Sequence, residues 1–174
     1  MKIRTEAVAL KHIAAAYNGV YNVVAKQIGA TREVSVRDLR PYDLGDTTNT
    51  DYFTITYAAT GWQTIYDTTV PSRKAFVIYG VSLPNATQTT SAIRITSGAN
   101  RVRWIMLQEL YDGSAHGRTV YFATDDQFIF QENTRILIEG YALSASTDYV
   151  VILGFVAEPL GETVYKPSKP LTSI

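Results

Sequence analysis

The chain has 174 residues, no cysteine, and 16 basic against 16 acidic residues, so its formal net charge is zero. This length predicts one domain with a core large enough to fold without cross-links. The lack of cysteine excludes disulfides, cysteine-based zinc sites and thiol nucleophiles. The balanced charge argues against a general nucleic-acid-binding surface.

Charge distribution and hydropathy add two expectations. Residues 1–110 carry a net charge of +4 and residues 111–158 a net charge of −5. This difference is typical either of charges scattered over solvated faces or of two parts that meet different surfaces, as in self-assembling subunits. The amino end lacks the uninterrupted apolar core of a signal peptide, and no run reaches the ~18 apolar residues that span a bilayer. We therefore expect a soluble protein made in the cytoplasm.

The first predicted element is a helix over residues 6–28, because apolar residues recur there at spacings of three and four. Thr5 is the expected N-cap and Gly29 the expected stop, whereas Gly19 weakens the middle and could divide the helix in two. This alanine-rich face permits close approach to the chain's own β domain or to a neighbouring subunit. Its apolar residues are Leu10, Ile13, Tyr17, Val20, Val24 and Ile28, with Tyr21 beside them.

Residues 31–51 form the expected connector, because Pro41 and the turn residues after it break any regular element. Val34 and Val36 alternate with polar residues and predict a short edge strand. Two arginines in the connector are either solvated or, at a subunit contact, bidentate anchors. The predicted assembly contact consists of Leu10, Ile13, Tyr17, Tyr21, Val24, Arg37 and Arg40.

Short alternating or apolar segments separated by turn residues follow, and they predict strands. If the two segments around Gly61 count as one interrupted strand, the total is eight strands. Long loops at 67–73 and 85–91 favour Greek-key crossings and hence a jelly roll. An immunoglobulin-like sandwich stays open, because one sequence does not determine the strand order. The expected strands cover residues 52–58, 62–66, 74–83, 92–96, 101–110, 119–123, 127–131, 134–142 and 149–157, with a further loop at 144–147.

The predicted fold is all-β, an eight-stranded jelly-roll β-sandwich over residues 51–158. An N-terminal helical arm and connector precede it at residues 1–50. An extended C-terminal tail follows at residues 159–174, because prolines 159, 167 and 170 exclude a helix there.

No catalytic constellation stands out. Ser114, His116 and Asp112 can be written as a triad, but they lie too close in sequence to adopt triad geometry, and no nucleophile elbow precedes them. His12 lies far from His116 along the chain, so the two histidines do not predict a metal cluster. We expect each histidine to make a solvent contact or a local hydrogen bond.

Three acidic residues and the glycines are also best explained as turn residues and not as a binding site. Asp125, Asp126 and Glu132 could form a paired-carboxylate or calcium site, but they bracket a strand, where aspartate is a common turn residue. The sequence has no Walker loop and no dinucleotide-binding glycine fingerprint. We therefore expect no enzyme activity, no cofactor and no metal.

The two tryptophans provide the alternative function. A flat aromatic ring on a β-sandwich can stack on a sugar, which would make the protein a carbohydrate- or receptor-binding module. Trp104 lies in a long apolar strand and is expected in the core. Trp62 follows Gly61 and is expected nearer the surface.

Three stretches resemble the single jelly-roll proteins of bacteriophage heads, which are small capsid subunits or the cement and decoration proteins that sit on them. They are VIYGVSLPNAT at 77–87, AIRITSGANRVRWIMLQELY at 92–111 and ILIEGYALSASTDYVVILGFVAEPLG at 136–161. The resemblance implies a virion structural protein without catalytic residues. Its implied partners are copies of itself, with a trimer favoured, and a major capsid protein. The long helical arm departs from the smallest decoration proteins.

Overall fold

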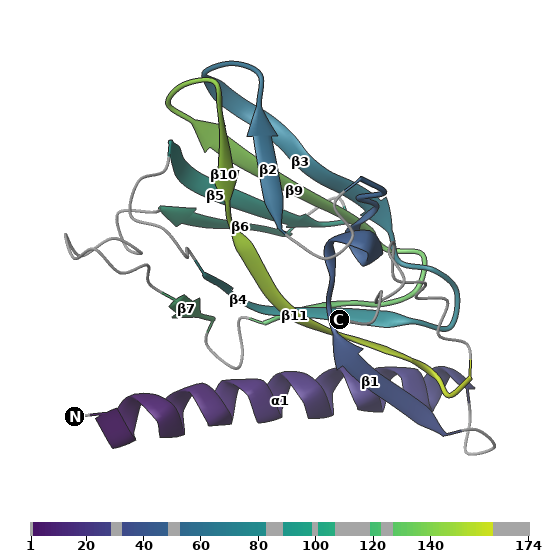
Figure 1. The fold of residues 1–174 in the computed structure, drawn as a ribbon. Helices are drawn as coiled ribbons and strands as arrows, with labels where there is room; N and C mark the ends of the chain where they lie inside the picture. Colours follow the sequence, from purple (N-terminus) through teal and green to yellow (C-terminus); the bar gives the residue numbers. More distant parts are fainter. Residues whose placement is uncertain are drawn as a thin grey trace, which may run out of the picture.

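The computed structural model describes residues 2–28, 33–48, 53–82, 89–98, 101–106, 119–122 and 127–161. A long helix, a short 3-10 helix and a series of antiparallel strands follow one another in these residues (Figure 1). Their order is α1 (Lys2–Ile28), β1 (Val34–Asp38), η1 (Pro41–Leu44), β2 (Thr54–Tyr57), β3 (Gly61–Thr69), β4 (Ala75–Ser82), β5 (Thr90–Ser97), β6 (Arg101–Met106), β7 (Thr119–Tyr121), β8 (Phe128–Phe130), β9 (Arg135–Ala142), β10 (Ser146–Tyr149) and β11 (Val151–Pro159).

The strands form two packed sheets and a short ribbon. The first sheet has the order β1-β11-β4-β7, with β8 also paired to β4, and the second has the order β3-β9-β5-β6. The chain starts in the first sheet at β1, enters the second at β3, returns to the first at β4, and crosses again to the second for β5 and β6. It then returns to the first sheet for β7 and β8, enters the second for β9, and ends in the first at β11. This path is the double Greek key of a jelly roll, so the all-β prediction is confirmed and the immunoglobulin-like order is excluded.

The main core lies between the two sheets. One cluster of buried side chains joins Phe76 and Ile78 of β4 with Ile93 of β5 and Ile138 of β9. The alternate residue Val77 belongs to a separate cluster on the other face of β4. Because β4 is buried on both faces, its sequence is almost continuously apolar.

Strand β11 approaches β4 so closely that Gly154 has no room for a side chain. A Cβ atom at this position would lie 2.3 Å from the carbonyl oxygen of Val77 and 2.9 Å from Cδ2 of Leu39. The pairing of β11 with β4 shifts register between Leu153 and Gly154, as it does at a β-bulge. The glycine is therefore required by close backbone approach.

The ribbon of β2 and β10 continues the pairing of β3 with β9 around a corner. Tyr57 pairs with Ser146, and Gly61 pairs with Ala142. The pairing of β2 with β10 therefore has the same register as the pairing of β3 with β9. The pairing is interrupted at residues 58–60 and at the residues that face them. This arrangement agrees with the prediction of one strand interrupted near Gly61.

Two predicted loops are partly strand. β3 extends to Thr69 because it pairs with β9 as far as Arg135. The loop predicted at 144–147 contains the start of β10. On that strand Asp148 is only 4% exposed and accepts the backbone N–H of Thr89 at 2.9 Å and of Thr90 at 2.7 Å. These long-range bonds override the turn preference of the local serine and threonine residues.

The helix α1 is a single element of 27 residues that begins at Lys2, so Thr5 lies in its first turn and the predicted N-cap is wrong. Gly19 does not divide the helix. A Cβ atom there would lie 3.0 Å from Cδ1 of Ile129 on β8, so the glycine lies where helix and sheet approach closely. The predicted stop at Gly29 falls outside the described residues.

The connector and the tail meet at the edge of the first sheet. The predicted edge strand is present as β1, which pairs antiparallel with β11 from Val34 opposite Pro159 to Asp38 opposite Phe155. Pro159 is therefore the last residue of a strand. The N–H of the next residue donates to the Glu33 carbonyl at 2.8 Å. Residues 162–174, the rest of the predicted tail, lie outside the described residues.

Candidate functional site

Helix α1 lies along the outer face of the first sheet (Figure 1). Ala16, Val20 and Val24 are 0% exposed and form an apolar cluster with sheet residues that include Val77 and Phe155. Packing of an amphipathic face supplies most of the stability of such a helix. Of the two predicted positions for the helix, the chain shows the one on its own β domain.

An aromatic band fills the interface between helix and sheet. The His12 ring stacks on Tyr121 with centroids 6.0 Å apart, and Tyr121 stacks on Tyr79 at 6.3 Å. Phe155 lies 5.2 Å from Tyr79 and meets Tyr17 edge-on at 5.9 Å. Nδ1 of His12 is buried and has no hydrogen-bond partner among the described residues. Of the solvent contact or local hydrogen bond expected for His12, neither is made at Nδ1, and stacking on Tyr121 positions the ring.

Alkaline pH is expected to destabilise the fold through Tyr79 and Tyr57. Burial, aided by the charge of Asp38, raises the pKa of Tyr79 to about 12. Burial also raises the pKa of Tyr57 to about 12, although a hydrogen bond from Thr90 lowers it and the charge of Asp148 raises it. Tyrosine in an unfolded chain has a pKa of about 10. The stability linked to these protons is therefore complete below pH 10 and is lost as the pH rises to 12.

Urea unfolding across this pH range measures the effect. The urea concentration at the unfolding midpoint should be lower at pH 11 than at pH 10. Phenolate absorbance should show that some tyrosines ionise only as the chain unfolds. An identical midpoint at both pH values would contradict the expectation.

A second apolar stripe on α1 lies beside the buried face. Leu10 is 65% exposed, Tyr17 43% and Tyr21 41%, and Ala14 between them is exposed as well. At about 100° per residue, these side chains fall within about 60° of one another and about a quarter turn from the buried face. They extend over about 16 Å of the helix axis. We name Leu10, Ala14, Tyr17 and Tyr21 the helix stripe.

The helical residues predicted to make the assembly contact separate into two groups. Ile13 and Val24 pack into the cluster beneath the helix, so they belong to the fold of this chain. Leu10, Tyr17 and Tyr21 lie in the helix stripe, and their role in assembly stays a prediction. Spacing alone could not separate the groups, because both fall within one broad apolar face.

Arg37 is bound within its own chain. Its guanidinium donates to both carboxylate oxygens of Asp43 at 2.8 and 2.7 Å and to Glu158 at 3.0 Å. Glu158 is fully buried and also accepts from Lys74 at 2.5 Å. Burial alone would lower the pKa of Arg37, but the hydrogen bonds and charges of these carboxylates raise it above its usual value. The side chain of Arg40 is exposed, and its predicted subunit contact stays a prediction.

The other candidate residues give no reactive centre within the described ranges. Glu132 accepts the Arg73 N–H at 2.6 Å and the Ser72 hydroxyl at 3.1 Å, so its carboxylate holds a turn. Within those ranges no group of three or more histidine, aspartate or glutamate side chains could hold a metal ion. No described helix combines the length and apolar character needed to cross a membrane. The candidates outside the described residues are Asp112, Ser114, His116, Asp125 and Asp126.

Trp62 lies half-buried on the second sheet. The Arg94 guanidinium lies 4.5 Å from the centre of its ring, and Tyr141 packs edge-on at 5.5 Å. Two bonds of 2.5 Å to Glu139 hold Arg94 in place. One face of the indole is therefore covered by a cation–π contact, and a sugar stacking there would have to displace Arg94. The side chain of Trp104 is outside the described part of the chain.

No protein-family model matches the chain, and no curated protein matches it significantly. Among solved structures it is similar to the mosquito-larvicidal Cry4Aa toxin from Bacillus thuringiensis, with a TM-score of 0.31, 13% identity, and coverage of 72% of this chain and 21% of the toxin. It is also similar to the VP2 subviral particle of infectious bursal disease virus, with a TM-score of 0.28, 16% identity, and coverage of 74% and 32%.

A family two carbohydrate esterase from Cellvibrio japonicus is a further similar structure, with a TM-score of 0.26, 11% identity, and coverage of 73% of this chain and 34% of the esterase. The chain thus spans about a third or less of each of these chains. All three TM-scores are too low to decide fold or function. The strand order alone defines the molecule as a jelly-roll β-sandwich with a helix docked on one sheet.

Proposed function

We propose that this protein is a structural subunit of a virion, either a small capsid protein or a cement or decoration protein of an icosahedral bacteriophage head. The observation that carries the proposal is the helix stripe, which leaves two tyrosines and a leucine exposed on a helix docked against a jelly roll. Tyrosine is enriched in protein interfaces. The resemblance of three strand segments to phage-head proteins supports the same function.

Assembly in this proposal uses a pre-formed surface. The helix is already ordered against its own sheet, so binding through the stripe does not incur the entropy cost of folding an arm. The partners are other copies of this chain, with a trimer as the expected oligomer, and a major capsid protein. The opposite net charges of residues 1–110 and 111–158 favour contacts between unlike parts of two subunits. No catalysis and no cofactor belong to this role.

The double variant Leu10→Ser with Tyr21→Ser tests the stripe. Both side chains are largely outside the core, so the variant is expected to unfold at nearly the wild-type midpoint. Its self-association is expected to weaken at least tenfold, because losing interface anchors costs about 1–2 kcal/mol each. Sedimentation velocity measures self-association, and co-sedimentation with phage heads measures attachment.

The matched control is Leu143→Ser with Tyr149→Ser, at side chains 61% and 45% exposed just after β9 and at the end of β10. This control is expected to associate like the wild type. Equal losses in both variants, or unchanged association of the stripe variant, would contradict the proposal.

A further inference from the structure

Strand β1 lies at the margin of the first sheet (Figure 1), and alternate backbone groups on it point away from that sheet. The N–H of Leu39 donates to the Gly154 carbonyl at 2.9 Å, and the N–H of Leu160 donates to the Glu33 carbonyl at 2.8 Å. In an antiparallel pair, residues that exchange such bonds alternate with residues that do not. The residues whose N–H and C=O groups face the outer edge are therefore Val34, Val36 and Asp38.

This outer edge has no strand partner in the part of the chain that the structure describes, where β1 pairs with β11 alone. Val34 and Val36 are partly exposed and Asp38 is exposed. The Asp38 carbonyl accepts a long bond from the Arg37 guanidinium at 3.3 Å, but a carbonyl oxygen has two lone pairs. An unpaired edge of this kind is a template for a strand from another chain.

One side of α1 faces the far side of the same sheet. His12 stacks on Tyr121 of β7, and Gly19 approaches Ile129 of β8. Both of these strands pair with β4, on the side of β4 away from β11 and β1. This side of the helix is therefore turned away from the β1 edge.

The helix stripe lies on the other side of α1, toward the β1 edge. Tyr17 packs edge-on against Phe155, and Phe155 pairs with Asp38 at the end of β1. At about 100° per residue, Tyr17 and Tyr21 lie about half a turn around the helix from His12. The exposed tyrosines and the unpaired strand edge thus belong to one side of the molecule.

From these features we infer that two copies of this chain join β1 to β1 as an antiparallel pair about a twofold axis, with their helix stripes facing each other over the extended sheet. This inference rests on the proposed function, because it specifies how the helix stripe meets a second copy. An icosahedral lattice has twofold as well as threefold axes, so this contact is compatible with trimers formed through another surface.

The twofold axis passes beside Val36. In that register Val36 faces Val36 and Val34 faces Asp38, so every outward N–H and C=O group of both strands has a partner. A shift toward the end of β1 would place Arg37 opposite Arg37, and like charges directly opposite each other destabilise a strand pair. A shift in the other direction would leave Asp38 beyond the end of the facing strand.

The distance between the two helices suits tyrosine side chains. α1 contacts β4, β11 and β1, so its axis runs over β11, the middle strand of the three. In the paired sheet the two β11 strands would be three strand spacings apart, about 14 Å. Helices in direct contact are about 8–10 Å apart, so large side chains are needed to fill the remainder. Tyr17 and Tyr21, which are 43% and 41% exposed, supply them from both copies.

Amide hydrogen exchange of the ¹⁵N-labelled full chain, followed by NMR at low and high protein concentration, tests the pairing residue by residue. The amides of Val34, Val36 and Asp38 should exchange rapidly in the dilute monomer. They should exchange about tenfold more slowly once about nine-tenths of the chain is dimeric, because exchange then proceeds through the remaining monomer. The intervening amides of Ser35 and Arg37 face β11 and should be protected at both concentrations.

A pair of variants at Asp38 tests the same contact. Asp38→Pro removes one outward N–H and places the proline ring in the contact, and an edge position of this kind tolerates proline in the monomer. Its self-association in sedimentation velocity is expected to weaken at least about tenfold, with nearly the wild-type unfolding midpoint. Asp38→Ala, the matched control, loses the same side chain but keeps the N–H, and it should associate like the wild type.

Three results would overturn the inference. The wild type could stay monomeric at every tested concentration, the outward amides could exchange at the same rate in dilute and concentrated samples, or Asp38→Pro could associate as strongly as Asp38→Ala. The proposed function fails separately. If the variant Leu10→Ser with Tyr21→Ser still weakens association or attachment to phage heads, the helix stripe contacts its partner without strand pairing, and only the inference is lost.

Discussion

Replacing Glu158 by glutamine is expected to lower the free energy of unfolding by about 3 kcal/mol or more. The carboxylate of Glu158 is 0% exposed and accepts from Arg37 at 3.0 Å and from Lys74 at 2.5 Å. Glutamine keeps the shape but removes the negative charge, which leaves Lys74 facing a neutral amide and Arg37 with the carboxylate of Asp43 alone. Urea denaturation of the isolated chain measures the change.

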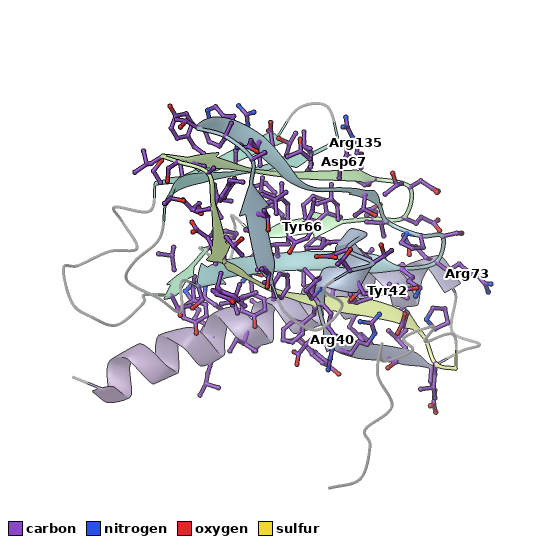
Figure 2. All side chains as sticks on the ribbon, turned by 45° about the horizontal axis from the view of Figure 1, so that its top comes forward. Arg40, Tyr42, Tyr66, Asp67, Arg73 and Arg135 are labelled. Carbon is purple, nitrogen blue, oxygen red and sulfur yellow. The ribbon has the colours of Figure 1, made fainter. Side chains whose placement is uncertain are left out.

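The control for this variant is the exposed pair of Asp67 and Arg135, which Figure 2 shows on the second sheet. Their side chains are 42% and 58% exposed, so Asp67→Asn is expected to leave the unfolding midpoint within experimental error. A large effect of Asp67→Asn, or a negligible effect of Glu158→Gln, would show that burial does not govern these ion pairs as argued.

The sequence was most informative where local pattern and tertiary environment agree. The strand predicted at 74–83 is present as β4, and its apolar run matches burial on both faces, because Val77 and Phe76 belong to two different clusters. Alternation at Val34 and Val36 indicated β1. In these segments the side-chain period of the strand matches the burial that the fold imposes.

The sequence did not predict which residues pair over long distances along the chain. The partner of Arg37 lies 121 residues away on β11, and nothing local to either residue indicates the other. Strand β10 was missed because its serine and threonine residues favour turns, whereas the buried Asp148 links it to β5 through backbone N–H groups. Such contacts depend on the Greek-key path, which a single sequence does not specify.

The sequence predicted the candidate sites only in part. The helix stripe shares its apolar character with the buried face, so no boundary between Tyr17 and Val20 could be predicted. Tyr66 appeared as one of several strand tyrosines that ordinary cross-strand packing explains. Its buried hydroxyl has no hydrogen-bond partner among the described residues, and no local pattern around Tyr66 indicates this.

The position of the helix has the largest consequence for assembly, and Val20→Asp decides it. Val20 is 0% exposed between α1 and the first sheet. A carboxylate there would be buried without a partner, so the variant is expected to lose at least about 3 kcal/mol of unfolding free energy. It should also bind hydrophobic dyes, because the apolar face of Val77 and Phe155 becomes uncovered. Urea denaturation at concentrations where the chain is monomeric measures the loss.

Asn22→Asp is the matched control, since it introduces the same carboxylate at an exposed position of the same helix and should unfold like the wild type. The comparison distinguishes a helix packed on its own domain from one donated to a neighbour. If the helix belonged to a neighbour, Val20→Asp would leave the monomer stable and abolish only the oligomer. A destabilised monomer instead means that the helix is part of the rigid body, so that its exposed stripe, and not the whole arm, is the surface available to another subunit.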